Sequence, residues 1–170
     1  MVFKVKKTIV VLASLLFINA LIYGLSMSSI EATSGKYAVI IVLSLLIFLN
    51  LLSLILNIIV IDGDTITVKS LYGKKNVSIL NLQEISFIPL KGRILMMLSD
   101  SNGFVFVSSM IDGFDKIAKV IRDNLKSKEL IEKIDEIDMG VINSKNRMVI
   151  VFLLIFNFLI AGSYIYNFLK

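Results

Sequence analysis

Three long apolar stretches dominate the sequence and limit what it can fold into. They cover Thr8–Met27, Tyr37–Ile61 and Met148–Phe168. At about 1.5 Å of rise per residue, about 20 helical residues match the roughly 30 Å hydrocarbon core of a bilayer. The second and third stretches are too long and too uninterrupted for ordinary core helices. The sequence therefore predicts a membrane protein with three spanning helices and one water-compatible module between the second and the third.

The first stretch has a second interpretation, as a cleavable signal peptide, because basic residues precede its apolar run. Its apolar core is long for that role, and a small-x-small cleavage site is poor around Ser26–Ser29. We expect the first stretch to remain as a span.

Composition excludes several kinds of chemistry. The chain contains neither histidine nor cysteine. Zinc sites built on imidazole or thiolate, histidine proton relays and cysteine nucleophiles are therefore ruled out. Asp62 and Asp64 lack the further ligands and the terminal glutamate of a calcium loop, and are interpreted as turn residues. We expect no enzymatic activity, no metal and no cofactor.

The net charge of +5 is concentrated at the membrane flanks, which argues against nucleic acid as a partner. Between Ile61 and Leu125, eight basic residues face seven acidic ones, so this segment forms no strongly basic surface.

The distribution of basic residues also predicts an orientation. They precede the first and third stretches: Lys4, Lys6, Lys7, Lys145 and Arg147. By the positive-inside rule, the chain is a multi-pass protein of the inner (cytoplasmic) membrane, with its N-terminus and residues 62–147 in the cytoplasm. The loop at 28–36, which carries only Glu31 and Lys36 as charges, and the C-terminus at Lys170 are expected outside.

Polar side chains inside the spans predict contacts between helices. The candidates are Asn19, Asn50, Ser53, Asn57 and Asn157. Asn50 and Asn57 are seven residues apart and share one face of the second helix with Ser53. No charged residue lies in the middle of a span, which argues against an ion-coupled transporter. We expect these groups to pack helices within the chain, with a second copy or with another membrane protein.

The middle segment reads as a small antiparallel sheet closed by a helix. Five or six short strands are predicted, from Asn57–Ile61 to Phe104–Ser108, and Asp62-Gly63-Asp64 is a hairpin signal. Apolar positions spaced by three and four predict a helix over Phe114–Leu125, capped by Asp112, and a continuation at Lys128–Met139 that breaks near Gly140. The resulting divisions are 1–36 (first span and external loop), 37–61 (second span), 62–125 (sheet and closing helix), 126–146 (helical linker) and 147–170 (third span).

This α+β arrangement resembles bacterial membrane proteins with a pleckstrin-homology-like domain. The resemblance rests on the run Ile59–Val68, on Leu82-Gln83-Glu84-Ile85 and on the closing helix Phe114–Leu125. The third span departs from the commonest layout of that class. What the resemblance implies is a binding or scaffolding module without enzymatic activity.

Two surfaces of the module are candidate sites. Four basic residues in two inter-strand turns are candidates for contact with anionic lipid: Lys74, Lys75, Lys91 and Arg93. Each basic residue near an anionic membrane surface contributes about 1 kcal/mol to binding. The alternatives are that the four residues form a specific site for a lipid headgroup, or that they only keep the turns soluble. Two strands are apolar on both faces, which predicts a partner-docking face of Ile88, Leu90, Leu95, Met97, Val105 and Val107. The alternative is that one of the two predicted helices covers this face.

These observations favour a non-catalytic membrane-anchored adaptor that binds a protein partner in a membrane complex. Two other functions stay open: self-protection against a membrane-active peptide, and an accessory subunit of an export machine.

Overall fold

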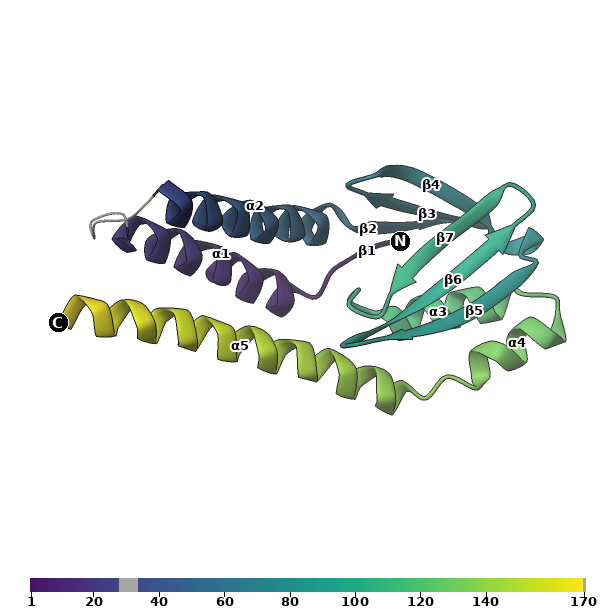
Figure 1. Ribbon diagram of the computed structural model, residues 1–170. Helices are drawn as coiled ribbons and strands as arrows, with labels where there is room; N and C mark the ends of the chain where they lie inside the picture. Colours follow the sequence, from purple (N-terminus) through teal and green to yellow (C-terminus); the bar gives the residue numbers. More distant parts are fainter. Residues whose placement is uncertain (28–33, 170) are drawn as a thin grey trace. The chain divides into compact units, whose positions relative to one another are not determined.

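The protein is described here by a computed structural model that covers residues 1–27 and 34–169. The chain forms two compact units. We call them the sheet unit, Met1–Lys6 and Ile55–Val149, and the helical unit, Lys7–Leu54 and Ile150–Lys170. The fold is α+β, with two antiparallel sheets and helices of very different length (Figure 1).

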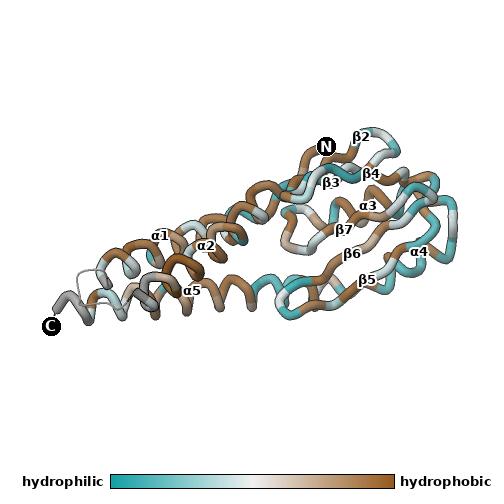
Figure 2. Tube along the Cα trace, turned by 45° about the horizontal axis from the view of Figure 1, so that its top comes forward, coloured by the Kyte–Doolittle hydropathy of each residue, from teal (hydrophilic) through white to brown (hydrophobic). Residues whose placement is uncertain are grey.

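Three helices are long and apolar enough to cross a membrane, as the sequence predicts. They are α1 (Lys7–Met27), α2 (Ser34–Leu56) and α5 (Met139–Leu169). Their candidate spans are Lys7–Ser26, Ala38–Leu56 and Met139–Tyr166. Figure 2 shows α1 and α2 brown along most of their length, whereas α5 begins with hydrophilic residues. Two parts of the chain that were predicted to lie on the external side of the membrane are not among the described residues: residues 28–33, which include Glu31, and Lys170.

The predicted end of the second span is wrong by about one turn. Helix α2 ends at Leu56, and strand β2 (Ile58–Asp62) follows after Asn57. The run Ile58-Ile59-Val60-Ile61 is wholly β-branched, which disfavours a helix and suits a strand. The turn at Gly63, with φ of 53°, then lets the chain pair back on itself.

The first sheet has the order β1-β2-β3-β4. Its other strands are β1 (Val2–Lys4), β3 (Thr65–Ser70) and β4 (Gly73–Ser78). Strand β1, which precedes the first span, was not predicted: Phe3 pairs with Ile59, and the Ile61 N–H donates to the Met1 carbonyl at 2.9 Å. The sheet therefore joins segments on either side of α1 and α2 in the sequence.

The second sheet has the order β5-β6-β7. The predicted number of strands is confirmed by β2 to β7, but the prediction that they form one sheet is wrong. Its strands are β5 (Glu84–Leu90), β6 (Arg93–Asp100) and β7 (Gly103–Ser108), and the short 3₁₀ helix η1 (Ile79–Asn81) separates β4 from β5. Because η1 interrupts the extended chain, the meander β2–β7 divides into three strands and three, and β1 adds a fourth strand to the first sheet.

The carboxylate of Asp100 connects the two sheets. Its Oδ2 accepts a hydrogen bond from the Ser78 N–H at 2.9 Å, and its Oδ1 accepts from the N–H groups of Asn102 at 2.8 Å and Gly103 at 3.1 Å. The bond from Ser78 contributes most to lowering the pKa of the buried Asp100, and the two turn N–H groups act in the same direction, although burial opposes them.

Helices α3 (Phe114–Asn124) and α4 (Lys128–Asp135) follow the sheets. The predicted apolar stripe of α3 is confirmed, since Phe114, Ile117, Ala118 and Ile121 are buried. The predicted Asp112 cap is wrong: Gly113, with φ of 73°, is the N-cap residue and no side chain caps the helix. Asp138 instead caps α5, with its Oδ1 accepting from the Gly140 N–H at 2.7 Å. The break expected near Gly140 lies at residues 136–138, between α4 and α5.

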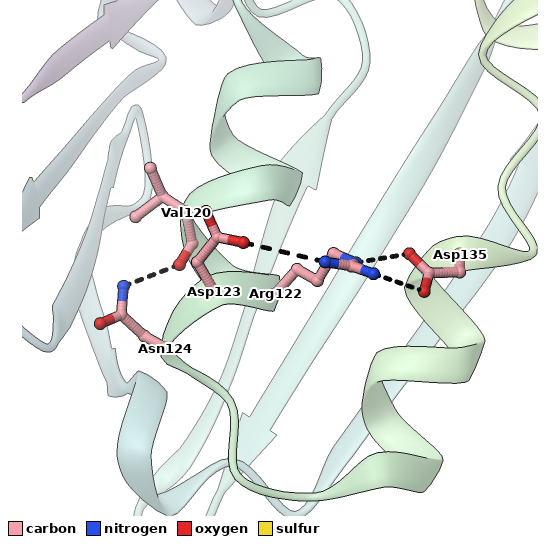
Figure 3. A network of polar contacts seen from close by, with 5 residues as sticks. All are labelled: Val120, Arg122, Asp123, Asn124 and Asp135. Carbon is pink, nitrogen blue, oxygen red and sulfur yellow. Dashed lines mark hydrogen bonds and ion pairs between the residues drawn. The ribbon is translucent and has the colours of Figure 1, made fainter.

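An ion pair joins α3 to α4. The Arg122 guanidinium donates to both carboxylate oxygens of Asp135, at 2.6 and 3.0 Å (Figure 3). The contact with Asp135 raises the pKa of Arg122, and the same hydrogen bond lowers the pKa of Asp135. Both side chains are about half exposed, so the pair orients the helices and contributes little to stability.

The core of the sheet unit lies between the two sheets and α3. Its fully buried side chains include Ile59, Ile66, Val77, Ile79, Ile85, Met96, Leu98, Val105, Ile117 and Ile121.

Candidate functional site

The register of the second sheet sorts its side chains into two faces. Residues paired across antiparallel strands share a face. Ile85 pairs with Leu98, which pairs with Val105, and Phe87 pairs with Met96, which pairs with Val107. Residues on this inner face at Ile85, Met96, Leu98, Val105 and Val107 are all buried. On the opposite side of the same strands lies the outer face, which combines the apolar residues Ile88, Leu95, Met97, Phe104 and Phe106 with the polar residues Glu84, Ser86, Ser99 and Ser108.

The predicted docking set mixes these two faces. Val105 and Val107 are 2% and 0% exposed and belong to the core, so their assignment to an exposed face is wrong. Ile88, Leu95 and Met97 lie on the outer face, and Leu90 is exposed where β5 turns into β6. Phe104 and Phe106, which are 46% and 40% exposed, take the places predicted for the two valines.

Helix α4 lies against the inner face. A cavity of about 300 Å³ between α4 and the sheet is lined by the inner-face residues Phe87, Pro89 and Ile94 on one side, and by Lys133 and Ile137 on the other. Helical cover, the alternative left open by the sequence, therefore applies to the face that holds Val105 and Val107. On the outer face, Ile88, Phe104 and Phe106 are exposed, Leu95 and Met97 are half-buried, and Ser108 is buried.

The apolar part of the outer face contains an aromatic pair. The rings of Phe104 and Phe106 lie edge to face with their centres 5.4 Å apart, and the Lys75 ammonium lies 4.6 Å from the centre of the Phe104 ring. The outward side of β3 and β4, by contrast, carries Thr67, Lys69, Lys74 and Asn76. The outward side of the first sheet is thus polar at these positions, whereas the outer face of the second sheet exposes Ile88, Phe104 and Phe106.

The four candidate basic residues do not converge on one site. Lys74 and Lys75 lie in β4 of the first sheet, and Lys91 and Arg93 lie at the β5–β6 turn of the second. Phe104, against which Lys75 rests, pairs with Ser99, six residues or roughly 20 Å along β6 from Arg93. No single anion contacts all four side chains in this arrangement.

The β5–β6 turn packs against the beginning of α5. The Lys145 ammonium donates to the Leu90 carbonyl at 3.2 Å, and a Cβ atom at Gly92 would lie 2.6 Å from a methyl group of Val149. The close approach to Val149 and the φ of 85° together explain why glycine occupies this position.

A buried polar pair anchors the same helix to the second sheet. The Asn146 side-chain amide donates to the Ser109 carbonyl at 2.8 Å, and the Ser109 hydroxyl donates to Asn146 Oδ1 at 3.2 Å. A polar cavity of about 390 Å³ lies beside them and is also lined by Lys6, Asp112 and Asp115. Because Ser109 and Asn146 satisfy each other, their role is to position α5.

In the helical unit, two of the candidate asparagines meet. The Asn19 amide donates to Asn157 Oδ1 at 2.9 Å, and the Asn157 amide donates to the carbonyls of Leu12 at 3.1 Å and Leu153 at 2.8 Å. Asn157 is buried, so the pair links α1 to α5.

The other span candidates are placed differently. Asn50 is exposed on α2 and donates to the Leu46 carbonyl of its own helix at 2.8 Å. Ser53 is half-buried on the same helix. Asn57 follows the end of α2, so its assignment to the span is wrong, and its buried Oδ1 has no hydrogen-bond partner.

Among the described residues, no three acidic side chains gather into a group that could hold a metal ion, and Asp62 and Asp64 flank the β2–β3 turn. No protein-family model, curated protein or solved structure matches the chain.

Proposed function

We propose that this chain is a non-catalytic membrane-anchored adaptor whose sheet unit binds a protein partner through its outer face. The observation that carries this proposal is the group of apolar side chains on the outer face, of which Ile88, Phe104 and Phe106 are exposed and Leu95 and Met97 are half-buried. Soluble surfaces rarely expose contiguous apolar patches without a binding role. Aromatic residues and methionine are also enriched in protein interfaces, whereas lysine and acidic residues are depleted.

The proposed relation to pleckstrin-homology-like domains is supported by topology. Consecutive antiparallel strands lead into α3, whose apolar stripe is buried against the core. In the proposed adaptor this sheet unit is a rigid recognition module, and α1, α2 and α5 hold it at the bilayer.

We place the sheet unit on the cytoplasmic side of the inner membrane. The basic residues around the spans support this side. The pairing of β1 with β2 supports a shared side for the N-terminus and the middle segment, because both strands belong to one sheet.

Orientation is testable because the chain contains no cysteine. We expect a single cysteine in a Tyr72→Cys variant to react with a membrane-impermeant maleimide only after the cells are permeabilised, since Tyr72 is 92% exposed in the sheet unit. A Lys170→Cys variant is expected to react in intact cells. Labelling of Tyr72→Cys in intact cells would contradict the proposed orientation.

The docking role predicts a position-dependent crosslink. A photoreactive amino acid at Phe106 or Met97 in the full-length protein is expected to give a specific protein adduct in the native host. The same group at Thr67, on the outward side of the first sheet, is the control and is expected to give none. Adding Leu95→Asp to the Phe106 probe should abolish the adduct, because a charge in the apolar face opposes its burial. Equal adducts from all positions, or adducts with lipid alone, would rule the role out.

A further inference from the structure

Among the described side chains of α2, the carboxamide of Asn50 is an exposed polar group well inside the apolar span. It lies six residues before the end of the helix, about 9 Å along the axis from Leu56, and is surrounded by leucine and isoleucine. Its amide nitrogen donates to Leu46, but no described residue donates to its Oδ1. Asn19 and Asn157, by contrast, satisfy each other inside the same unit. In hydrocarbon, where no water is available, an outward-facing amide favours a protein partner.

The neighbours of Asn50 form a stripe along α2 with alternating spacings of four and three. We call it the α2 seam: Val39, Leu43, Leu46, Asn50 and Ser53. Its first three members are each more than half exposed. This spacing averages 3.5 residues, which is the repeat that lets two helices pack along their whole length.

The α2 seam points away from the contacts that α2 makes with α1. Those contacts lie on another side of the helix, where Phe48 meets Phe17 with ring centres 5.5 Å apart and where a Cβ atom at Gly24 would lie 2.7 Å from a methyl group of Ile40. Asn50 follows Phe48 by two residues, or about 200° around the helix. The seam is therefore free to pack against a helix outside the described part of the chain.

We propose that the occupant is a second copy of this chain, with α2 packed in parallel against α2 and Asn50 against Asn50. Two copies inserted in the same orientation present the same seam at the same depth. A carboxamide is self-complementary, because it carries both a donor and an acceptor, so it pairs across a two-fold axis. A single asparagine at a core position of a heptad is also a known determinant of register and of the dimeric state. The proposal is independent of the adaptor role and of the outer face.

Disulfide scanning of the full-length protein tests the interface directly, because the natural chain has no cysteine to interfere. Under mild oxidation in membranes, the Leu43→Cys, Leu46→Cys and Asn50→Cys variants are expected to form covalent dimers. The Ile41→Cys and Leu45→Cys variants are the matched controls, since both side chains are as exposed as the seam but lie on other sides of α2. Dimers at the controls, or no periodicity at all, would overturn the proposal.

A second measurement separates the amide pair from general helix packing. In phosphatidylethanolamine–phosphatidylglycerol vesicles, energy transfer between labelled copies is expected to show a dimer that weakens on dilution. Asn50→Leu should raise its dissociation constant roughly three- to twentyfold, whereas Asn50→Gln, which keeps a donor and an acceptor, should restore most of the affinity. A monomeric natural protein, or equal affinity for Asn50→Leu, would refute the pairing of Asn50 with its copy.

Discussion

A Val107→Asp variant is expected to lose the folded sheet unit. Val107 is 0% exposed and pairs with the buried Met96, so the new carboxylate has neither water nor a hydrogen-bond donor around it. Burying such a group costs on the order of 4 kcal/mol or more, which is a large share of the roughly 5–15 kcal/mol that stabilises a typical domain. Hydrogen exchange of the full-length protein in micelles should show lost protection throughout β2 to β7.

The adjacent residue provides the matched control. Phe106→Asp adds the same charge one position earlier, on the outer face, and should leave the protection of β6 and β7 nearly unchanged. If both variants unfold the sheet unit, the outer face is covered in the native protein and the assignment of the two faces is wrong. If neither does, Val107 is not in the core.

An Asp100→Ala variant is expected to be the most damaging removal of a polar side chain from the sheet unit. It deprives three backbone N–H groups, those of Ser78, Asn102 and Gly103, of their acceptor. Hydrogen bonds to a charged group typically contribute about 1.5–3 kcal/mol each, but turn N–H groups regain water, so the expected loss is about 3 kcal/mol. Thermal unfolding followed by circular dichroism measures it, with Asp123→Asn as an exposed control that should change little.

The lowered pKa of Asp100 also gives this loss a pH dependence. Because the folded protein holds the carboxylate charged more readily than the unfolded chain does, its contribution is complete above the unfolded pKa of about 4 and is lost as the pH falls through the folded pKa. The natural protein should therefore lose stability in acid more steeply than Asp100→Ala. The difference between their free energies of unfolding should decrease from pH 6 towards pH 3. A gap that does not depend on pH would show that Asp100 is not ionised in the fold.

Sequence alone predicts the features that depend on many residues at once. Three apolar helices follow from runs of about 20 residues, and the buried stripe of α3 follows from its spacing. Features that depend on one residue or on distant pairing are not predicted. Strand β1 has only three residues, and pairing with β2 rather than local pattern specifies it.

The exposed face is unpredictable for a related reason. Every position from Phe104 to Val107 is apolar, so alternation cannot tell which pair points inward, and a shift of one residue exchanges the two faces. The pairing of Val107 with Met96 and of Val105 with Leu98 decides which side chains point inward. The boundary between α2 and β2 is also difficult to predict from sequence. The isoleucine-rich run 58–61 is as apolar as the span before it, but its β-branched side chains favour a strand.

The pairing of β1 with β2 has a consequence for how the protein is made. Met1 and Ile61 are 60 residues apart, and both membrane helices between them are synthesised before the strand that β1 needs. The first sheet therefore closes only after both helices and β2 have left the ribosome, and until then β1 lacks its pairing partner. Completion of the first sheet is therefore a late event, which follows the synthesis of both helices.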